Sequence, residues 1–145
     1  MRAALMCLTV FALAACATRS SSSPIDARAV VEAKFAAVNR HDVAAVVALY
    51  APDAVITASD FCATRNGRAD VERTYRGIFA AIPDVVADVQ EYVVEGDRVA
   101  VRFVVRGHVG DYLVAVPIMD FFTVRGGLIV RDDGAFDNAG RACSP

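Results

Sequence analysis

The spacing of apolar residues changes at Val85, and this change limits the chain to folds that combine helices with an antiparallel sheet. From Arg98 to His108 apolar and polar residues alternate, which is typical of a strand with one buried face. Three further segments are strand-like, and Gly-containing turns separate them: Val85–Val94, Tyr112–Arg125 and Leu128–Phe136. Consecutive long strands joined by tight turns predict an antiparallel meander.

The N-terminal half instead carries apolar residues at helical spacing. The first helix is expected to begin at Ser23 and Pro24, because an N-cap followed by Pro at the first helical position is a common helix start, and to end near Asn39. Asp42 is expected to cap a second helix that extends to Tyr50. The rest of this half is predicted to be a short strand (Ala54–Ala58), a polar loop (Ser59–Asn66) and a third helix from Gly67 to Pro83.

The order of these elements predicts an α+β domain. Three helices of the N-terminal half would pack on the concave face of one curved antiparallel sheet. A chain of 145 residues has room for one such domain, because two halves would each be too small to bury a core. Its 15 basic and 17 acidic residues include no run of Lys or Arg, so nucleic acid is not expected as a partner.

The first residues follow the order of a secretory signal, with a positive charge at Arg2 and then an apolar run over residues 3–13. The run is too short to span a bilayer. It ends in Leu13-Ala14-Ala15-Cys16, which resembles the lipobox of bacterial lipoproteins, and the resemblance implies that Cys16 carries diacylglyceryl as the new N-terminus. Ala17 then implies an outer-membrane lipoprotein that faces the periplasm. The alternative is ordinary cleavage, which leaves a soluble periplasmic or secreted protein.

Cys7 leaves with the signal and Cys16 carries the lipid. The exported domain therefore keeps two of the four cysteines, Cys62 and Cys143. In an oxidising compartment such a pair is more often a disulfide than a metal site, which predicts a bond between Cys62 and Cys143. The chain then divides into a lipoprotein signal (1–15), a Ser-rich tether (16–23), the domain (24–138) and a C-terminal tail (139–145).

Several short motifs follow one another along the domain. They are Phe35-Ala-Ala-Val-Asn39 with Asp42, Leu49-Tyr50-Ala-Pro-Asp53-Ala-Val, Gly67-Arg68-Ala69-Asp70-Val71, Glu95-Gly96-Asp97-Arg98-Val99-Ala-Val, and Asp120-Phe-Phe-Thr-Val with Gly127-Leu-Ile-Val. In this combination the stretch Val31–Asp137 resembles the nuclear transport factor 2-like superfamily, especially its bacterial SnoaL-like members. The resemblance implies a cone-shaped, cystatin-like roll around an apolar pocket. It leaves the function open, because the superfamily hosts isomerases, cyclases, epoxide hydrolases, dehydratases and pocket proteins without known chemistry.

Asp120 is the residue best suited to chemistry in such a pocket. It shares one face of its strand with Ile118, Phe122 and Val124. A carboxyl group in apolar surroundings has a raised pKa and can act as a general acid, a base or a hydrogen-bond donor. The resemblance adds that Asp120 falls where ketosteroid isomerases of the superfamily hold the aspartic acid that binds the developing oxyanion. The alternative is a structural ion pair with Arg102 or another basic side chain of the neighbouring strand.

The other isomerase positions and the acidic C-terminal end supply no further candidate. The isomerase's general base falls on Ala58 and its tyrosine near Lys34, so steroid isomerisation is not supported. Asp132, Asp133 and Asp137 are expected to be surface acids. Because the sequence has 2 His and no Gly-rich phosphate-binding motif, neither a metal site nor a cofactor is expected.

Arg102 and His108 share one face of a predicted strand with Arg98 and Arg106. This face is either solvated or lies at the mouth of the cone, where one or two of its side chains bind an anionic group. Alternation shows which residues share a face and does not show which way that face points. With Tyr75, whose alternative role is a core aromatic with a satisfied hydroxyl, Arg102 and His108 are the candidate ligand-binding residues.

Two functions remain open. The first is binding of a small apolar molecule in the cone. The second is a pocket enzyme, such as a cyclase, isomerase or hydrolase, that uses Asp120 as an acid, base or oxyanion donor. A second titratable group within reach of Asp120 would distinguish them, because acid–base chemistry on a carbon skeleton usually needs two groups. Either function is compatible with a homodimer formed through the sheet.

Replacement of Cys16 tests the lipid anchor. Cys16→Ser should move the protein from the membrane fraction to the soluble fraction, because acyl chains contribute about 0.8 kcal/mol per buried methylene. Cell fractionation followed by immunoblotting measures this. Cys7→Ser, in the segment expected to be cleaved off, is the matched control. Recovery of the Cys16→Ser protein in membranes at the wild-type level would contradict the anchor.

Overall fold

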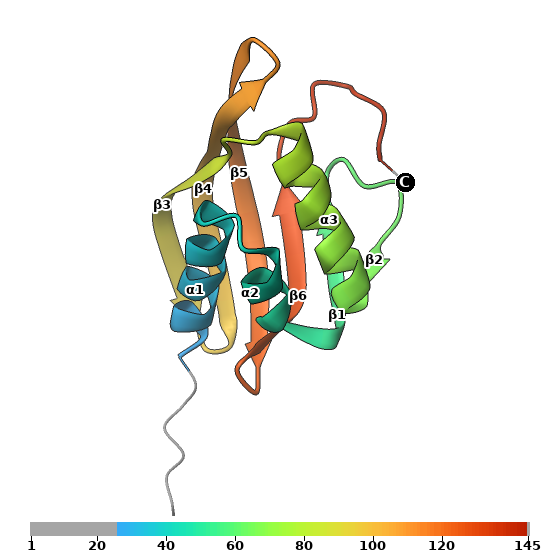
Figure 1. The fold of residues 1–145 in the computed structure, drawn as a ribbon. Helices are drawn as coiled ribbons and strands as arrows, with labels where there is room; N and C mark the ends of the chain where they lie inside the picture. The colour runs from blue at the N-terminus through green and yellow to red at the C-terminus, as the bar shows by residue number, and fades with distance from the viewer. Residues whose placement is uncertain (1–25, 145) are drawn as a thin grey trace, which may run out of the picture.

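The computed structural model describes residues 26–144 of the chain, and Figure 1 shows its fold. The predicted signal, the lipidation site Cys16 and the tether lie outside the described residues. Six strands and three helices make up the domain. Within residues 26–144 no helix is long and apolar enough to cross a membrane.

Three helices precede the long strands: α1 (Ala27–Asn39), α2 (Val43–Ala48) and α3 (Gly67–Ala81). The start of the first helix differs from the prediction. Helix α1 begins after Asp26, whose carboxylate accepts a hydrogen bond from the Arg28 amide at 3.0 Å, rather than after Ser23. Asp42 caps α2 as predicted, through a 2.9 Å hydrogen bond from the Ala45 amide.

The six strands form one sheet in the order β2-β1-β6-β5-β4-β3. The strands are β1 (Tyr50–Ala58), β2 (Arg65–Asn66), β3 (Val86–Glu95), β4 (Arg98–Val109), β5 (Tyr112–Arg125) and β6 (Leu128–Ala135). Strands β3 to β6 form the predicted antiparallel meander. The sheet is not antiparallel throughout, however, because β1 pairs with β6 in parallel. The two-residue strand β2 lies in the segment predicted to be loop.

Tyr50 is the first residue of β1. The helical spacing predicts it at the end of the second helix, and this prediction is wrong because α2 ends at Ala48. Leu49 accepts a 2.8 Å hydrogen bond from the Ile129 amide, and Tyr50 is paired with Ile129 in the sheet. This parallel pairing joins segments far apart in the chain, so the local pattern does not show it.

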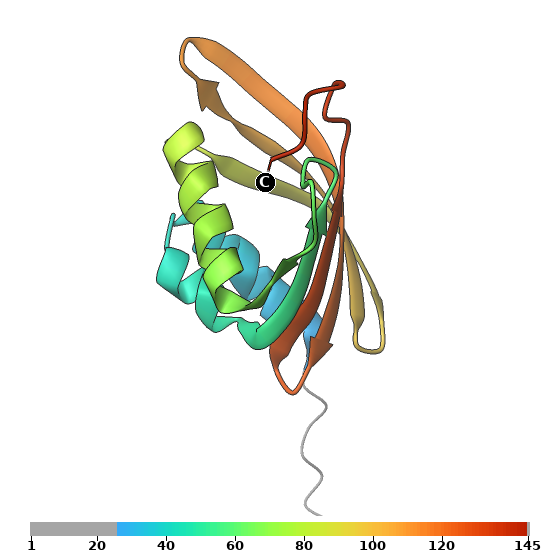
Figure 2. The ribbon, with the colours of Figure 1, turned by 90° about the vertical axis from the view of Figure 1, so that its right-hand side faces the viewer.

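The sheet curves around the helices, and Figure 2 shows them on its concave side. The main core lies between α1 and this face. Phe35 of α1 is 3% exposed and packs edge-on against Phe103 and Phe122, with ring centroids 4.8 and 6.1 Å away. Burial of one such side chain contributes about 1.5–3 kcal/mol. The predicted α+β fold, with helices on the concave face of a curved sheet, is confirmed.

The predicted disulfide is present between Cys62 and Cys143, with the two Cα atoms 4.9 Å apart. Because β1 and β6 are parallel neighbours, the loop after β1 and the tail after β6 leave the same end of the sheet. Ser144 strengthens this connection, since its amide donates to the Asp60 carbonyl at 2.6 Å and its carbonyl accepts from the Cys62 amide at 2.9 Å. We call residues 60–62 and 143–144 the clasp.

Removal of the disulfide should destabilise the domain. Cys62→Ser/Cys143→Ser should lower the free energy of unfolding by about 4 kcal/mol. The bond joins residues 81 positions apart and so restricts the unfolded chain. Urea unfolding of the double variant measures the loss, and reduced wild-type protein is the control. Two freely alkylatable thiols in protein purified from an oxidising compartment would rule out the bond.

Candidate functional site

A cavity of about 660 Å³ lies between the concave face of the sheet and helices α1 and α3. Most of its wall is apolar and comes from both helices and from β1, β4, β5 and β6. Four polar side chains on this wall belong to one buried cluster with Tyr50 behind them: Lys34, Tyr75, Asp120 and Asp132. An apolar cavity with a few convergent polar groups is the usual form of a small-molecule site.

Asp120 points into the cavity from β5. The residue is 7% exposed, and its Oδ1 atom has no hydrogen-bond partner among the described residues. Its Oδ2 atom lies 3.6 Å from Nζ of Lys34. Burial raises the pKa of the Asp120 carboxyl well above its ordinary value, the charge of Asp132 adds to the increase, and Lys34 opposes it. The geometry therefore favours the protonated form of Asp120.

Lys34 reaches the cluster from α1 and is 3% exposed. Its Nζ atom lies 4.2 Å from the ring centroid of Phe35 and 4.7 Å from that of Phe122, which are cation–π distances. Burial alone would lower the pKa of the ammonium group. Interactions with Tyr75 and with the carboxyl groups of Asp132 and Asp120 outweigh burial and raise this pKa above its ordinary value. Lys34 is thus a buried cation that the cluster must balance.

Asp132 completes the cluster from β6. It is 5% exposed, and its Oδ2 atom accepts a 2.5 Å hydrogen bond from the Tyr50 hydroxyl. Burial and the charge of Asp132 raise the pKa of Tyr50 well above its ordinary value, which keeps the phenol a neutral donor. With one ammonium and two carboxyl groups, the buried cluster is neutral when Asp132 is ionised and Asp120 holds a proton.

The burial of Asp132 corrects the prediction that it is a surface acid. A register shift between β5 and β6 at Thr123 and Val124 breaks the alternation of β6, so Ile129 and Asp132 are both buried. Asp133 is half-buried and accepts a 2.6 Å hydrogen bond from Thr57, while Asp137 is exposed as predicted.

Two of the candidate ligand-binding residues lie outside the cavity. The Arg102 side chain is on the outer face of β4, where it contacts Glu91 at 3.3 Å and Gln90 at 2.6 Å. His108 is exposed, with Nδ1 at 2.6 Å from Asp84 Oδ2. Alternation turns Arg102 away because Val101 and Phe103 face the core. The suggested ion pair between Asp120 and Arg102 is therefore wrong, since the cation beside Asp120 is Lys34.

Tyr75 does line the cavity, as the third candidate ligand-binding residue. Burial raises the pKa of its phenol, and the charge of Lys34 opposes this increase. Lys34 itself was missed as a site residue, although its position between Val31 and Val38 on one helical face indicates that it is buried. Within residues 26–144 no group of three His, Cys, Asp or Glu side chains is suited to hold a metal ion.

Comparison with known proteins agrees with this fold. The sequence matches the SnoaL-like domain family over residues 31–132. No curated protein is significantly similar to the chain. The solved structures include a hypothetical protein with a ketosteroid isomerase-like fold from Catenulispora acidiphila in complex with trimethylamine. It is 26% identical, with a TM-score of 0.67, over 72% of this chain and 82% of that one.

Two further similar structures are provisionally described as polyketide cyclases. The protein from Sinorhizobium meliloti is 29% identical, with a TM-score of 0.63, over 73% of this chain and 93% of its own. IdmH from Streptomyces antibioticus is 27% identical, with a TM-score of 0.70, over 79% of this chain and 94% of its own. Since the family match spans most of the chain and the solved structures share its cone-shaped fold, the chain belongs to the SnoaL-like domain family.

Proposed function

We propose that the domain binds a small molecule with an apolar body, and that one polar group of this molecule contacts Asp120. The observation that carries the proposal is the unpartnered Oδ1 atom of Asp120 in the wall of a mostly apolar cavity of about 660 Å³. A buried polar atom without a partner costs about 1–3 kcal/mol. A ligand that forms a hydrogen bond with Oδ1 removes this cost, which favours binding of molecules that carry such a group.

The balance of charge in the cluster supports a neutral ligand. The ammonium of Lys34 already faces two carboxyl groups, and a further full charge in this buried place would lack a partner. A protonated Asp120 can donate a hydrogen bond to a carbonyl or hydroxyl oxygen. The relatives support small-molecule binding in general, since one is described in complex with trimethylamine and two are provisionally polyketide cyclases.

A second candidate function is acid–base catalysis in the same cavity. It is favoured by the 3.6 Å approach of Lys34 to Asp120, because this gives the carboxyl group the second titratable partner that such chemistry needs. Asp120 would donate a hydrogen bond to a substrate carbonyl, and the Lys34 ammonium would stabilise the negative charge that develops on the oxygen. Turnover that is lost in both Asp120→Asn and Lys34→Met would support the enzyme over the binding protein.

We also propose a location for the domain and a second copy of the chain as its partner. We place it at the periplasmic side of the outer membrane, held by the lipid on Cys16 that the lipobox-like Leu13-Ala14-Ala15-Cys16 implies. We also propose that two copies pair through the outer face of β5. Met119 and Phe121 on this face are 50% and 42% exposed.

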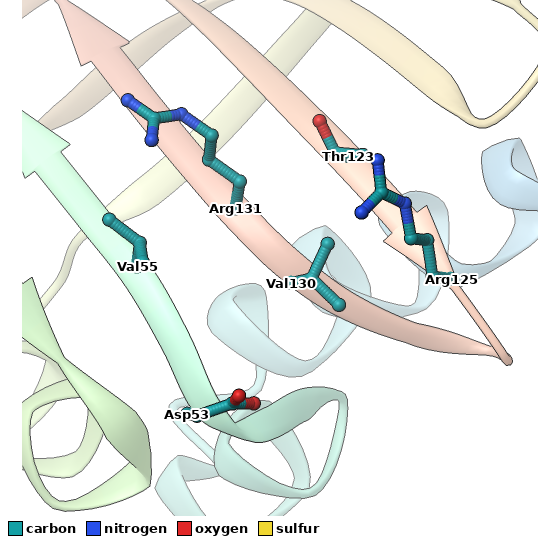
Figure 3. A pocket seen from close by; sticks show the side chains of 6 residues that line it. All are labelled: Asp53, Val55, Thr123, Arg125, Val130 and Arg131. Atoms are coloured by element: carbon teal, nitrogen blue, oxygen red, sulfur yellow. The ribbon is translucent and has the colours of Figure 1, made fainter.

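The outer face of β5 is suited to a second copy of itself. Met119 is paired in register with Arg102 on one side, and Phe121 with Asp133 on the other. Both flanking charges already have partners in their own copy, Glu91 at 3.3 Å from Arg102 and Arg131 at 2.6 Å from Asp133. A second copy can therefore cover the apolar strip under a two-fold axis without leaving a charge unpaired. A shallow hollow of about 280 Å³ lies on the same sheet, where a partner would cover it, and Figure 3 shows the side chains that line it. It is lined by Asp53, Val55, Thr123, Arg125, Val130 and Arg131.

Variants of Asp120 test the binding proposal with 2-naphthol, an apolar probe with one hydroxyl group. Asp120→Leu should weaken binding of 2-naphthol about tenfold, because it removes the hydrogen bond while it fills a similar space. Asp120→Asn should stay within about threefold of the wild type, since the amide can still form this bond. Fluorescence titration measures both. Equal affinity of the wild type and the Leu variant would contradict the role of Asp120.

Stability measurements separate this effect from misfolding. Below about pH 4 Asp120→Asn should change the free energy of unfolding by less than about 1 kcal/mol, because Asn and a protonated Asp are both neutral. The raised pKa means that the folded protein holds the Asp120 proton more tightly than the unfolded chain. Wild-type stability should therefore fall as pH rises from about 4, the ordinary Asp value, through the raised pKa. The Asn variant should lack this decrease.

Light scattering tests the homodimer. The wild type should have the molar mass of two chains, and Phe121→Asp should have half of it, because the added charge would be buried between the copies. Tyr112→Asp is the control, since Tyr112 is 79% exposed at the turn between β4 and β5. A monomeric wild type at micromolar concentration would rule the dimer out.

A further inference from the structure

The hairpin of β4 and β5 carries the inner face of the sheet beyond the cavity. Val105 and Val116 are register partners in this hairpin, and both line the cavity. Val109 and Tyr112 are the last partners before the turn, and the pairing between these two positions of the ladder is continuous. Because side chains alternate along a strand, Val109 and Tyr112 lie on the same face as the cavity wall. In Figure 2 the hairpin reaches past the end of α3.

Burial along this face decreases toward the tip of the hairpin. On β5 the inner face is buried at Phe122, partly buried at Val116 and 79% exposed at Tyr112. On β4 Phe103 is buried, while Val109 is 46% exposed. The apolar wall of the cavity thus continues into solvent, and residues 26–144 leave its outer end largely uncovered. We call Val109 and Tyr112 the lip.

The connection between α3 and β3, residues 82–85, crosses the inner face between the cavity and the lip. It rests directly on β4, because a Cβ atom at Gly107 would overlap with Cγ2 of Ile82. Asp84 fastens it there, since its carboxylate accepts a 2.7 Å hydrogen bond from the His108 amide and lies 2.6 Å from His108 Nδ1. On β5 the register partner of Gly107 is Val114, which is only partly buried. The more open path from the cavity to the lip therefore follows β5.

We propose that the lip is a subsite for the apolar end of an elongated ligand, such as a long-chain fatty alcohol, whose other end lies in the cavity. This inference rests on the proposed function, because it names the shape of the molecule that the cavity binds. From Asp120 to Val116 the strand rises by about 14 Å, and from Asp120 to Tyr112 by about 27 Å. Contact with the lip thus favours an extended apolar chain over a compact molecule that ends inside the cavity.

Two other occupants fit this surface less well. Asp111 lies in the turn between Val109 and Tyr112, so a carboxylate would enter a bilayer together with the apolar side chains, which is costly. A second copy of the chain would have to reach the inner side of the sheet next to residues 82–85. A slender chain that leaves the cavity is already on this side.

Two alcohols of different length test the lip. 1-Octanol and 1-tetradecanol are each titrated against bound 2-naphthol, and the change in 2-naphthol fluorescence gives their affinities. Val109→Ser/Tyr112→Ser should weaken binding of 1-tetradecanol about tenfold, because the end of its chain loses an apolar contact. The affinity for 1-octanol should stay within about twofold of the wild type, since this chain is too short to reach the lip.

Leu113→Ser is the matched control. Leu113 is 72% exposed in the same hairpin, and alternation places it on the outer face of β5. Its replacement should leave the affinities for both alcohols within about twofold of the wild type. All three substituted positions are exposed near the turn, so the variants should fold, and circular dichroism checks this.

The outcomes separate the lip from the function on which it rests. If the folded double variant binds 1-tetradecanol as the wild type does, or loses affinity for both alcohols alike, the lip is wrong and binding in the cavity stands. The same holds if 2-naphthol binds and neither alcohol displaces it. An equal loss in Leu113→Ser would assign the effect to the hairpin as a whole and overturn the lip. If 2-naphthol and both alcohols fail to bind, the proposed function fails and the lip fails with it.

Two further measurements test the other occupants. A lower molar mass of the double variant than of the wild type in light scattering would make the lip an interface between copies, and would overturn the subsite. Sedimentation with phosphatidylglycerol vesicles is compared in Cys16→Ser protein, which lacks the predicted lipid. Vesicle binding that depends on Val109 and Tyr112 would assign the lip to a membrane and also overturn the subsite.

Discussion

The burial of the Lys34 ammonium is the constraint on which the cavity depends. A lysine that is 3% exposed must have carboxylate and aromatic partners, or it loses its proton. Strands β5 and β6 supply Asp120 and Asp132, which are offset by two residues in register on the same inner face. Helix α1 can pack on the sheet only where its lysine meets these acids. The polar cluster thus determines where the helix lies on the concave face, and with it the shape of the space that remains.

The same cluster combines structural and functional demands in one place. Tyr50 and Asp132 form a closed pair, since the phenol donates to the carboxylate and both are buried. Asp120 differs because only one of its oxygens has a neighbour of opposite charge. A purely structural site would satisfy both oxygens, as most buried polar groups do. The incomplete bonding of Asp120 is what distinguishes the part of the cluster available to a ligand from the part that holds the fold together.

Much of the fold could be predicted from local patterns, and the failures have physical reasons. The alternation in Arg98–His108 predicted β4, and the period of two that puts Asp120 on one face with Ile118, Phe122 and Val124 predicted its inward position on β5. The sequence predicts Asp132 at the surface because acidic side chains are rarely buried. The register shift that brings it to the inner face leaves no signal in the local pattern. Tyr50 was assigned to a helix because its partner in β6 is distant in sequence, and no local spacing reports a parallel pairing.

The residues of the site were likewise predictable only where a local pattern reports their position. Alternation placed Arg102 and His108 on one face and could not tell inner from outer, which depends on how the finished sheet curves. Lys34 could have been found from its helical spacing, but its partners come from two strands and become neighbours only in the folded domain. The disulfide was predictable, because the count of cysteines in the domain left one pairing.

The parallel pairing of β1 with β6 also bears on how the chain folds. Tyr50 and Asp132 are 82 residues apart, and Cys62 and Cys143 are 81 residues apart, so both contacts join segments that are far apart in the sequence. Contacts of such high sequence separation require a large loss of chain entropy before they form, which slows folding. The hairpins of β3 to β6 are local by comparison. The pairing of β1 with β6 is therefore the least local part of the sheet, and the disulfide of the clasp makes this connection covalent.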